Sequence, residues 1–325
     1  MLRREALAAL AGATTSAVLG ASAGTGPARS ALVAMDPTPS TVTAAVHASR
    51  RDFSDCRYDA LARALPGRIA LAQALGTGGH PEQAATAVAE LYTTATRLCI
   101  KLGEDGLAAV TADRALTAAL GGADALTVAE AHRMVSSAWR RQGRHARATD
   151  IAAARQLAAD RTCDATERLS VQGNLYATAA YTAAKQGDRH TAHALIAEAE
   201  ATAGRLGRDA QLRGGVFGPG QVLLHRISVS HLLGDAGQAV ELARRVDPAA
   251  LPTTERRARY WIDVARAFDQ WGKPDRCYRA LLAAERSAPQ EVRRDSVRTL
   301  TTGLLRHDRA LPGVRAFAHR TGALV

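Results

Sequence analysis

Five glycines at nearly regular intervals constrain the fold of this chain more than any other feature. They are separated by 40, 44, 47 and 38 residues, and each one follows a long run of residues with apolar side chains at helical spacing. Another helical run begins directly after each glycine. A glycine at a helix end adopts the left-handed conformation at little steric cost, so each predicts the turn of a helical hairpin. These turn glycines are Gly103, Gly143, Gly187, Gly234 and Gly272.

The side chains around the turn glycines repeat in the same register. Five residues after each glycine stands a small side chain: Ala108, Ala148, Ala192, Ala239 and Cys277. Eleven residues before each glycine the side chain is mostly a bulky ring: Tyr92, His132, Tyr176, Leu223 and Trp261. A small residue in the second helix lets the first helix approach closely, and a ring fills the space between hairpins. The register therefore predicts five structurally equivalent units.

One of these units resembles the tetratricopeptide repeat. The segment KQGDRHTAHALIAEAEA, residues 185–201, has the turn glycine of that repeat and its small residues Ala192 and Ala199. Tyr176 and Ala180 match the aromatic and small positions of its first helix. The spacing exceeds the 34 residues of the family, so these are elongated, tetratricopeptide-like units. The resemblance, over residues 80–289, implies an all-α fold, a right-handed superhelix of tetratricopeptide-like helical hairpins.

Longer stretches are similar to one group of proteins with such repeats. CRYDALARALPG, VDPAALPTTERRARYWIDVARA and LLAAERSAPQEVR resemble the C-terminal region of actinobacterial helix-turn-helix (XRE-type) transcriptional regulators. In those proteins an N-terminal DNA-binding domain precedes the repeats. We expect that residues 1–50 do not form the helices of such a DNA-binding domain.

The pattern predicts the following organisation of the chain. Residues 1–40 form a signal-like or disordered leader, and residues 41–325 form a single repeat domain. Within that domain we expect an N-terminal helix at 53–75, five hairpins over about 80–289 and a helical C-terminal cap at 290–323.

The leader has two readings. Arg3 and Arg4, a weakly apolar stretch and an A-x-A site ending at Ala23 follow the pattern of a twin-arginine export signal at residues 1–23. An RR-x-x-L segment also lies at the junction between domains in the regulators named above. The four cysteines show neither a CxxC motif nor metal-ligand spacing. We expect a cytoplasmic protein, with export as the alternative, and no membrane span.

Polar side chains recur on one face of the first helix of every unit. All residues 13 and 6 positions before the turn glycines are polar, and a separation of seven places both on one helical face. Amide side chains can pair with a peptide backbone, and arginines can hold carboxylates in bidentate fashion. A solvated inner face would also be polar. The candidate ligand-binding residues are Glu90, Arg97, Glu130, Arg133, Arg140, Asn174, Tyr181, Gln221, Ser228, Arg259 and Arg266.

Four further features of the sequence give weaker evidence about function. The segment from Gly214 to His225 is a mobile loop at the groove or an ordinary connection between repeats, with Pro219 suited to the first turn of a helix. His190 and His193 could bind a metal weakly, or simply lie on a solvated helix start. No catalytic or phosphate-binding motif is present, so we expect no enzyme, no cofactor and no metal. The net charge of +11 reflects solvated arginines more than sequence-specific DNA binding, because aromatic residues that would stack on bases are few.

These features together predict a non-catalytic binding module that captures a peptide or protein partner in its concave groove. The resemblance implies a role in transcriptional control, acting with a separate DNA-binding regulator. The alternative is a scaffold protein exported by the twin-arginine route.

Overall fold

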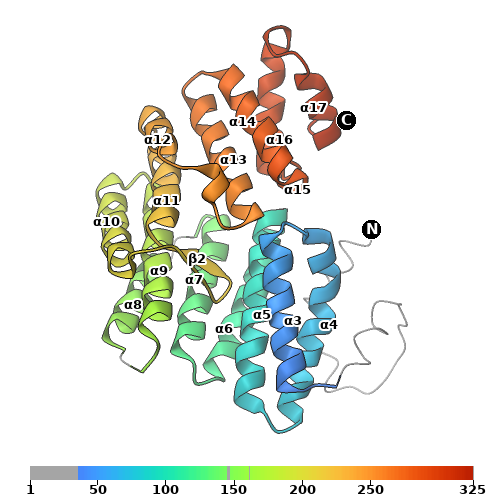
Figure 1. The fold of residues 1–325 in the computed structure, drawn as a ribbon, viewed down its shortest axis with the longest axis vertical. Coiled ribbons are helices and arrows are strands. Elements are labelled where there is room, and N and C mark those ends of the chain that lie inside the picture. The colour runs from blue at the N-terminus through green and yellow to red at the C-terminus, as the bar shows by residue number, and fades with distance from the viewer. Residues whose placement is uncertain (1–35, 145–146, 161, 325) are drawn as a thin grey trace. The chain divides into compact units, whose positions relative to one another are not determined.

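The protein is built from helices, as a computed structural model that describes residues 36–144, 147–160 and 162–324 shows (Figure 1). Within these ranges the chain is helical apart from connecting turns and one short β-hairpin. The predicted all-α fold of helical hairpins is therefore confirmed. The export signal predicted at residues 1–23 lies outside the described residues.

The five predicted turn glycines close the hairpins. Their φ angles are all positive, from 68° at Gly272 to 88° at Gly234. The residue after each glycine donates its backbone N–H to the carbonyl five positions back, for example Asp188 to Ala183 at 3.0 Å. This bond satisfies a carbonyl that the helix end leaves without a partner. The prediction made from the glycines is confirmed at each of the five turns.

Each turn joins two helices of the expected kind. The small residues five positions after the glycines are fully buried where they are described, as Ala108, Ala192, Ala239 and Cys277 show with 0% exposure. The hairpins are α5 (Pro81–Leu102) with α6 (Asp105–Leu120), α9 (Ala165–Lys185) with α10 (Arg189–Leu206), α11 (Pro219–Leu232) with α12 (Ala236–Ala243), and α13 (Thr254–Gln270) with α14 (Pro274–Ser287). The turn at Gly143 lies between α7 (Ala125–Arg141) and α8 (Arg147–Ala159).

The N-terminal region differs from the prediction. Instead of one helix over 53–75, the chain forms α3 (Pro39–Ser54) and α4 (Tyr58–Thr77). Residues 55–57 separate the two, and Cys56 has a positive φ of 59°. Arg68 of α4 donates hydrogen bonds to the side chains of Ser49 and Asp52 of α3, at 3.0 and 2.9 Å. These bonds attach α3 to α4.

The C-terminal cap is helical, as predicted. It consists of α15 (Pro289–Val292), α16 (Asp295–Leu304), the 3₁₀ segment η2 (Leu305–Ala310) and α17 (Val314–Thr321). Phe317 of α17 is fully buried and meets Tyr278 of α14 edge-on, with 5.8 Å between ring centroids. The cap therefore covers the apolar face that the last hairpin would otherwise expose.

A β-hairpin lies between the third and fourth helical hairpins, where the sequence predicted no strand. Strands β1 (Ala210–Leu212) and β2 (Gly215–Phe217) are joined by Arg213 and Gly214, which both have positive φ. Two such residues make the turn type that suits a two-residue hairpin loop. The loop is thus an ordered element that contacts α9 and α11, and Pro219 begins α11 as predicted.

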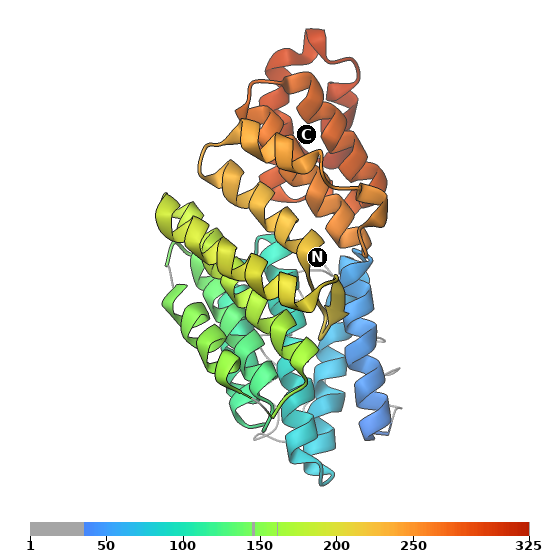
Figure 2. The same cartoon turned by 60° about the vertical axis from the view of Figure 1, so that its left-hand side comes forward.

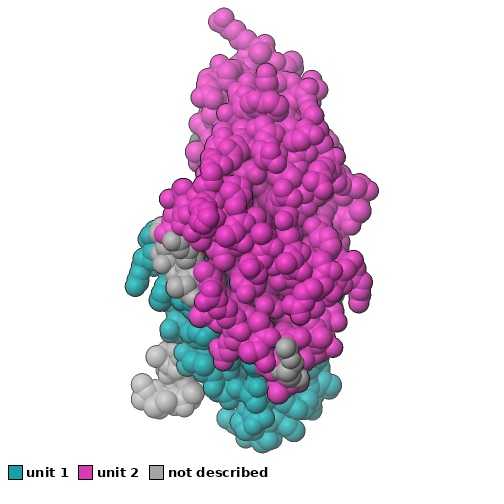
Figure 3. Space-filling model, turned by 90° about the vertical axis from the view of Figure 1, so that its left-hand side faces the viewer, with its two compact units in different colours: residues 1–53, 57–149 teal, residues 54–56, 150–325 magenta. Residues whose placement is uncertain are grey.

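Contacts between residues divide the chain into two compact units (Figure 3). Unit 1 contains residues 1–53 and 57–149, and unit 2 contains residues 54–56 and 150–325. Helices α3 to α7 belong to unit 1, and helices α9 to α17 belong to unit 2. The prediction of a single domain over residues 41–325 stays a prediction.

No helix among the described residues has both the length and the apolar character needed to cross a membrane.

Candidate partner-binding face

The predicted polar positions of unit 1 pair with neighbouring groups of opposite charge or with a ring. Glu90 of α5 forms an ion pair with Arg50 of α3 at 2.8 Å, and both side chains are about one-fifth exposed. The guanidinium of Arg97 lies over the ring of Phe53, 4.2 Å from its centroid. A cation over a ring face is attracted by the negative charge of that face. Both predicted residues of α5 are therefore held in fixed contacts.

On α7 two of the predicted residues bind each other. The Nε of Arg133 donates to Glu130 at 2.8 Å, and a second, shorter contact joins the same two side chains. They stand three residues apart on the helix, and both are more than four-fifths buried. Arg140, two turns beyond Arg133, is half-buried. The Glu130–Arg133 pair is neutral overall, so it presents little net charge to a ligand.

In unit 2 the structure brings three predicted residues together around a carboxylate that the prediction missed. Helix α11 packs against α9 on one side and against α13 on the other. Ser228 of α11 and Arg259 and Arg266 of α13 all bind Asp263 of α13. We call these four residues the Asp263 cluster. Figure 2 shows the run of helices to which they belong.

The geometry of the Asp263 cluster is fixed by four hydrogen bonds. Ser228 Oγ donates to Asp263 Oδ2 at 2.7 Å, and Arg259 Nε donates to the same oxygen at 2.8 Å. Arg266 Nη1 donates to Oδ1 at 3.1 Å, while its Nη2 donates to Ser296 Oγ at 3.2 Å. Asp263 is only 5% exposed, whereas the two arginine side chains keep 28% and 24% of their surface in solvent.

The two arginines keep Asp263 ionised. Burial by itself raises the pKa of a carboxyl group, but the charges of Arg259 and Arg266 and the hydrogen bonds outweigh it and lower the pKa of Asp263 to about 2. The charge of Asp263 in turn raises the pKa of Arg259. At neutral pH the cluster therefore contains two positive charges and one negative charge, a net charge of +1.

The two predicted amides of unit 2 are less accessible than its arginines. Asn174 of α9 donates its Nδ2 to the carbonyl of Ser170 at 3.1 Å. Strand β2 lies against it, since a Cβ at Gly215 would stand 3.5 Å from that Nδ2. Gln221 is 3% exposed, and Tyr181 is half-buried. A ligand on this face would therefore meet Arg259, Arg266 and Tyr181 before it met either amide.

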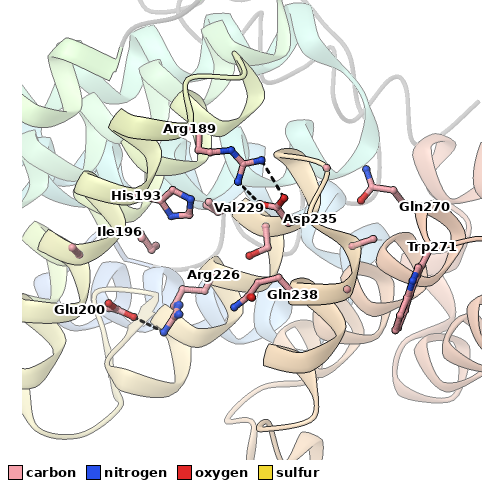
Figure 4. Close-up of a pocket in the computed structure, with 15 residues that line it drawn as sticks. Arg189, His193, Ile196, Glu200, Arg226, Val229, Asp235, Gln238, Gln270 and Trp271 are labelled. Atoms are coloured by element: carbon pink, nitrogen blue, oxygen red, sulfur yellow. Dashed lines mark hydrogen bonds and ion pairs between the residues drawn. The ribbon is translucent and has the colours of Figure 1, made fainter.

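An open pocket that the sequence did not predict lies elsewhere in unit 2 (Figure 4). It has a volume of about 820 Å³ and is lined by residues of α10 and α11, the first turn of α12 and the end of α13. His193, predicted as a weak metal ligand with His190, is exposed and lines this pocket. Among the described residues no three His, Cys, Asp or Glu side chains are grouped closely enough to hold a metal ion.

The comparisons with known proteins identify no family. No family model matches the chain, and no curated protein sequence matches it. A solved structure described as the crystal structure of BtubC (BKLC) from P. vanneervenii is similar over 67% of this chain and 86% of that chain, with 15% sequence identity and a TM-score of 0.43. So low a similarity assigns no activity or partner to this chain.

Proposed function

We propose that this protein is a non-catalytic, tetratricopeptide-like binding module that captures an acidic segment of a peptide or partner protein. The segment lies on the face formed by the first helices α9, α11 and α13. The observation that carries the proposal is the Asp263 cluster, in which one buried carboxylate positions two partly exposed arginines.

The hydrogen bonds of the cluster leave donors for a ligand. Of the five N–H groups of an arginine, Arg259 uses its Nε–H in bonds to the described residues and Arg266 uses one N–H from each terminal nitrogen. The terminal nitrogens of Arg259 have the fork geometry that binds a carboxylate in bidentate fashion. Because the bonds to Asp263 already fix the guanidinium, a ligand would order little additional side-chain freedom.

The wider role is part of the proposal. The resemblance to helix-turn-helix regulators supports a function in transcriptional control in the cytoplasm, together with a separate DNA-binding protein. An exported scaffold remains the alternative, supported by the sequence of residues 1–23. Fusing residues 1–40 to a reporter that is active only after twin-arginine export separates the two: an active reporter would contradict the cytoplasmic role.

Binding to the proposed face is tested with a charged probe. We expect fluorescein-labelled hexaglutamate, followed by fluorescence anisotropy, to bind more tightly than hexaglutamine or hexalysine. Its affinity should fall as salt is added, because exposed charges are screened over a Debye length of about 10 Å at 0.1 M ionic strength.

The informative variant replaces the charged trio by amides of similar shape: Arg259→Gln, Arg266→Gln and Asp263→Asn. It changes the net charge by −1 without leaving a buried charge unpaired. The matched control, Arg244→Gln, Arg279→Gln and Asp275→Asn, makes the same change with exposed side chains of α14 and of the residue that follows α12. We expect the first variant to weaken hexaglutamate binding at least tenfold and the control to leave it within twofold. Equal losses would show that only the overall charge matters.

A further inference from the structure

The pocket of unit 2 has the size of a small-molecule site. Its volume of about 820 Å³ lies within the range of roughly 300–1,000 Å³ typical of ligand pockets. Figure 4 shows Arg189 and His193 of α10, Arg226 of α11 and Trp271 around it. None of the residues predicted from the sequence to bind a partner lines this pocket.

Helix α12 begins at this pocket without a side-chain cap. Asp188, directly after Gly187, caps α10 by accepting the N–H of Thr191 at 3.1 Å. Asp235 stands at the same position after Gly234, but its carboxylate does not cap α12. Instead Arg189 binds it with both terminal nitrogens, one of them at 3.1 Å.

The first turn of α12 therefore offers free backbone donors to the pocket. The N–H groups of Gly237 and Gln238 make no hydrogen bond with the described residues. Gly237 has open space where a side chain would stand, so a ligand can approach its backbone. The N-terminal end of a helix also has a partial positive charge that favours anions.

A hydroxyl without a protein partner faces the pocket at the same place. Ser230 of α11 lines the pocket and is 6% exposed, and its Oγ stays accessible while making no hydrogen bond with the described residues. A ligand oxygen could therefore accept a hydrogen bond from this hydroxyl. Ser228, which binds Asp263, lies two residues away and about 200° around the helix axis at 3.6 residues per turn. The pocket is therefore separate from the Asp263 cluster.

The remaining lining combines paired charges with apolar surface. Arg226 binds Glu200 of α10 at 2.8 Å, so the two arginines and two carboxylates of the pocket balance, and His193 is exposed at its edge. Beside them lie the buried side chains of Ile196 and Val229. Such a lining accepts a molecule with one polar end and an apolar body.

Trp271 adds a fixed aromatic surface at the end of the pocket away from Ile196 (Figure 4). The side chain is 46% exposed. Its ring is parallel to that of Phe268, with 6.5 Å between centroids. A planar ligand body can stack or lie flat on an indole held in this way.

We propose that this pocket binds a small organic anion. Its oxyanion head group, a carboxylate or a phosphate, accepts hydrogen bonds from the first turn of α12 and from the hydroxyl of Ser230. Its apolar body lies against the indole of Trp271. The protein would thus respond to a small effector at a site distinct from the face proposed to bind a partner.

The probes for this site are 3-phenylpropionate, phenyl phosphate and the neutral 3-phenylpropanamide, titrated into the full chain by calorimetry. We expect at least one of the two anions to bind at least tenfold more tightly than the amide, because hydrogen bonds to a charged group are the stronger ones. Equal affinity of the anions and the amide, or no binding of any probe up to 10 mM (on the order of the weakest useful affinities), would overturn the proposal.

Ser230→Ala locates the site. It should weaken binding of the preferred anion about tenfold, while Ser287→Ala, the same change on α14, leaves it unchanged. Circular dichroism of both variants verifies that they are folded. Ser230→Ala should also leave hexaglutamate binding unchanged, so that failure here is distinguishable from failure of the proposed partner face. Unchanged binding of the anion to folded Ser230→Ala would contradict the assigned position.

Discussion

The polar faces of the first helices differ between the two units in how their charges are balanced. In unit 1, Glu130 pairs with Arg133 and Glu90 pairs with Arg50, so each of these two carboxylates binds one arginine. In unit 2, Asp263 binds both Arg259 and Arg266. Both faces look equally polar in the sequence. The comparison separates a carboxylate that holds one arginine from a carboxylate that holds two.

The largest expected loss of stability follows from removing the carboxylate of Asp263, which binds two arginines. Asp263→Asn leaves two arginines beside a buried neutral group, and breaking a buried ion pair costs about 3 kcal/mol or more. We expect the free energy of unfolding, measured by circular dichroism in urea, to fall by at least that amount. A loss below about 1 kcal/mol would mean that Asp263 is no more important than an ordinary surface carboxylate.

The next largest loss of stability is expected where the β-hairpin of unit 2 packs against α9. A Cβ at Gly173 would lie 1.8 Å from the ring of Phe217, which is fully buried. Gly173→Ala should therefore destabilise the protein by about 2 to 3 kcal/mol, although alanine favours helices. The double variant with Phe217→Leu should recover part of the loss in the same urea experiment. Gly204→Ala, on α10 with open space around it, is the matched control and should not destabilise.

Lowering the pH should reduce the free energy of unfolding, because Asp263 of unit 2 becomes protonated. The folded-state pKa of Asp263, about 2, is below that of an unfolded aspartate, about 3.9, so its contribution is complete above about pH 5 and is lost as the pH falls through 4 towards 2. The loss is on the order of 2 kcal/mol. Unfolding measured at pH 6, 4 and 3 should show wild type losing more stability than Asp263→Asn. Parallel curves for the two proteins would exclude the lowered pKa.

The smallest effect is expected in unit 1. Glu130→Gln removes the charge of a pair three residues apart on one helix, and pairs at this spacing contribute about 0.2–0.5 kcal/mol in isolated helices. Both side chains are more than four-fifths buried, so the loss should exceed that range but stay below the loss at Asp263, which binds two arginines. Compared with Asp263→Asn in the same assay, this conservative change should give the lesser loss. Equal losses at the two positions would remove the distinction between paired and shared carboxylates.

The glycines, the helical spacing of apolar residues and the repeated register together predicted the fold, because a glycine at positive φ is a common way to end a helix. The five turns, the small residues that follow them and the helix at Pro219 were predicted from the sequence. Helix α3 (Pro39–Ser54) was missed, since few of its residues are apolar and the break at residues 55–57 does not show in the sequence. The β-hairpin was missed because its strands are three residues long and its turn places Arg213 at positive φ.

The candidate site was predicted only in part, for a physical reason. Ser228, Arg259 and Arg266 were chosen as polar residues on one helical face, and they do meet. Asp263 stands between the two arginines on α13, but the sequence does not show which carboxylates a guanidinium will reach. Nor does it show that Asp235 turns away from α12 towards Arg189, which determines the character of the pocket.

The unequal numbers of residues between turn glycines show where elements are inserted between the helical hairpins. The shortest interval, from Gly234 to Gly272, contains helices and brief connections alone. The longest, from Gly187 to Gly234, holds the β-hairpin that rests on α9. In a chain of repeated helical hairpins, a longer interval between two turn glycines indicates that another element is inserted there. Counting residues between glycines in related sequences would therefore locate such insertions without any coordinates.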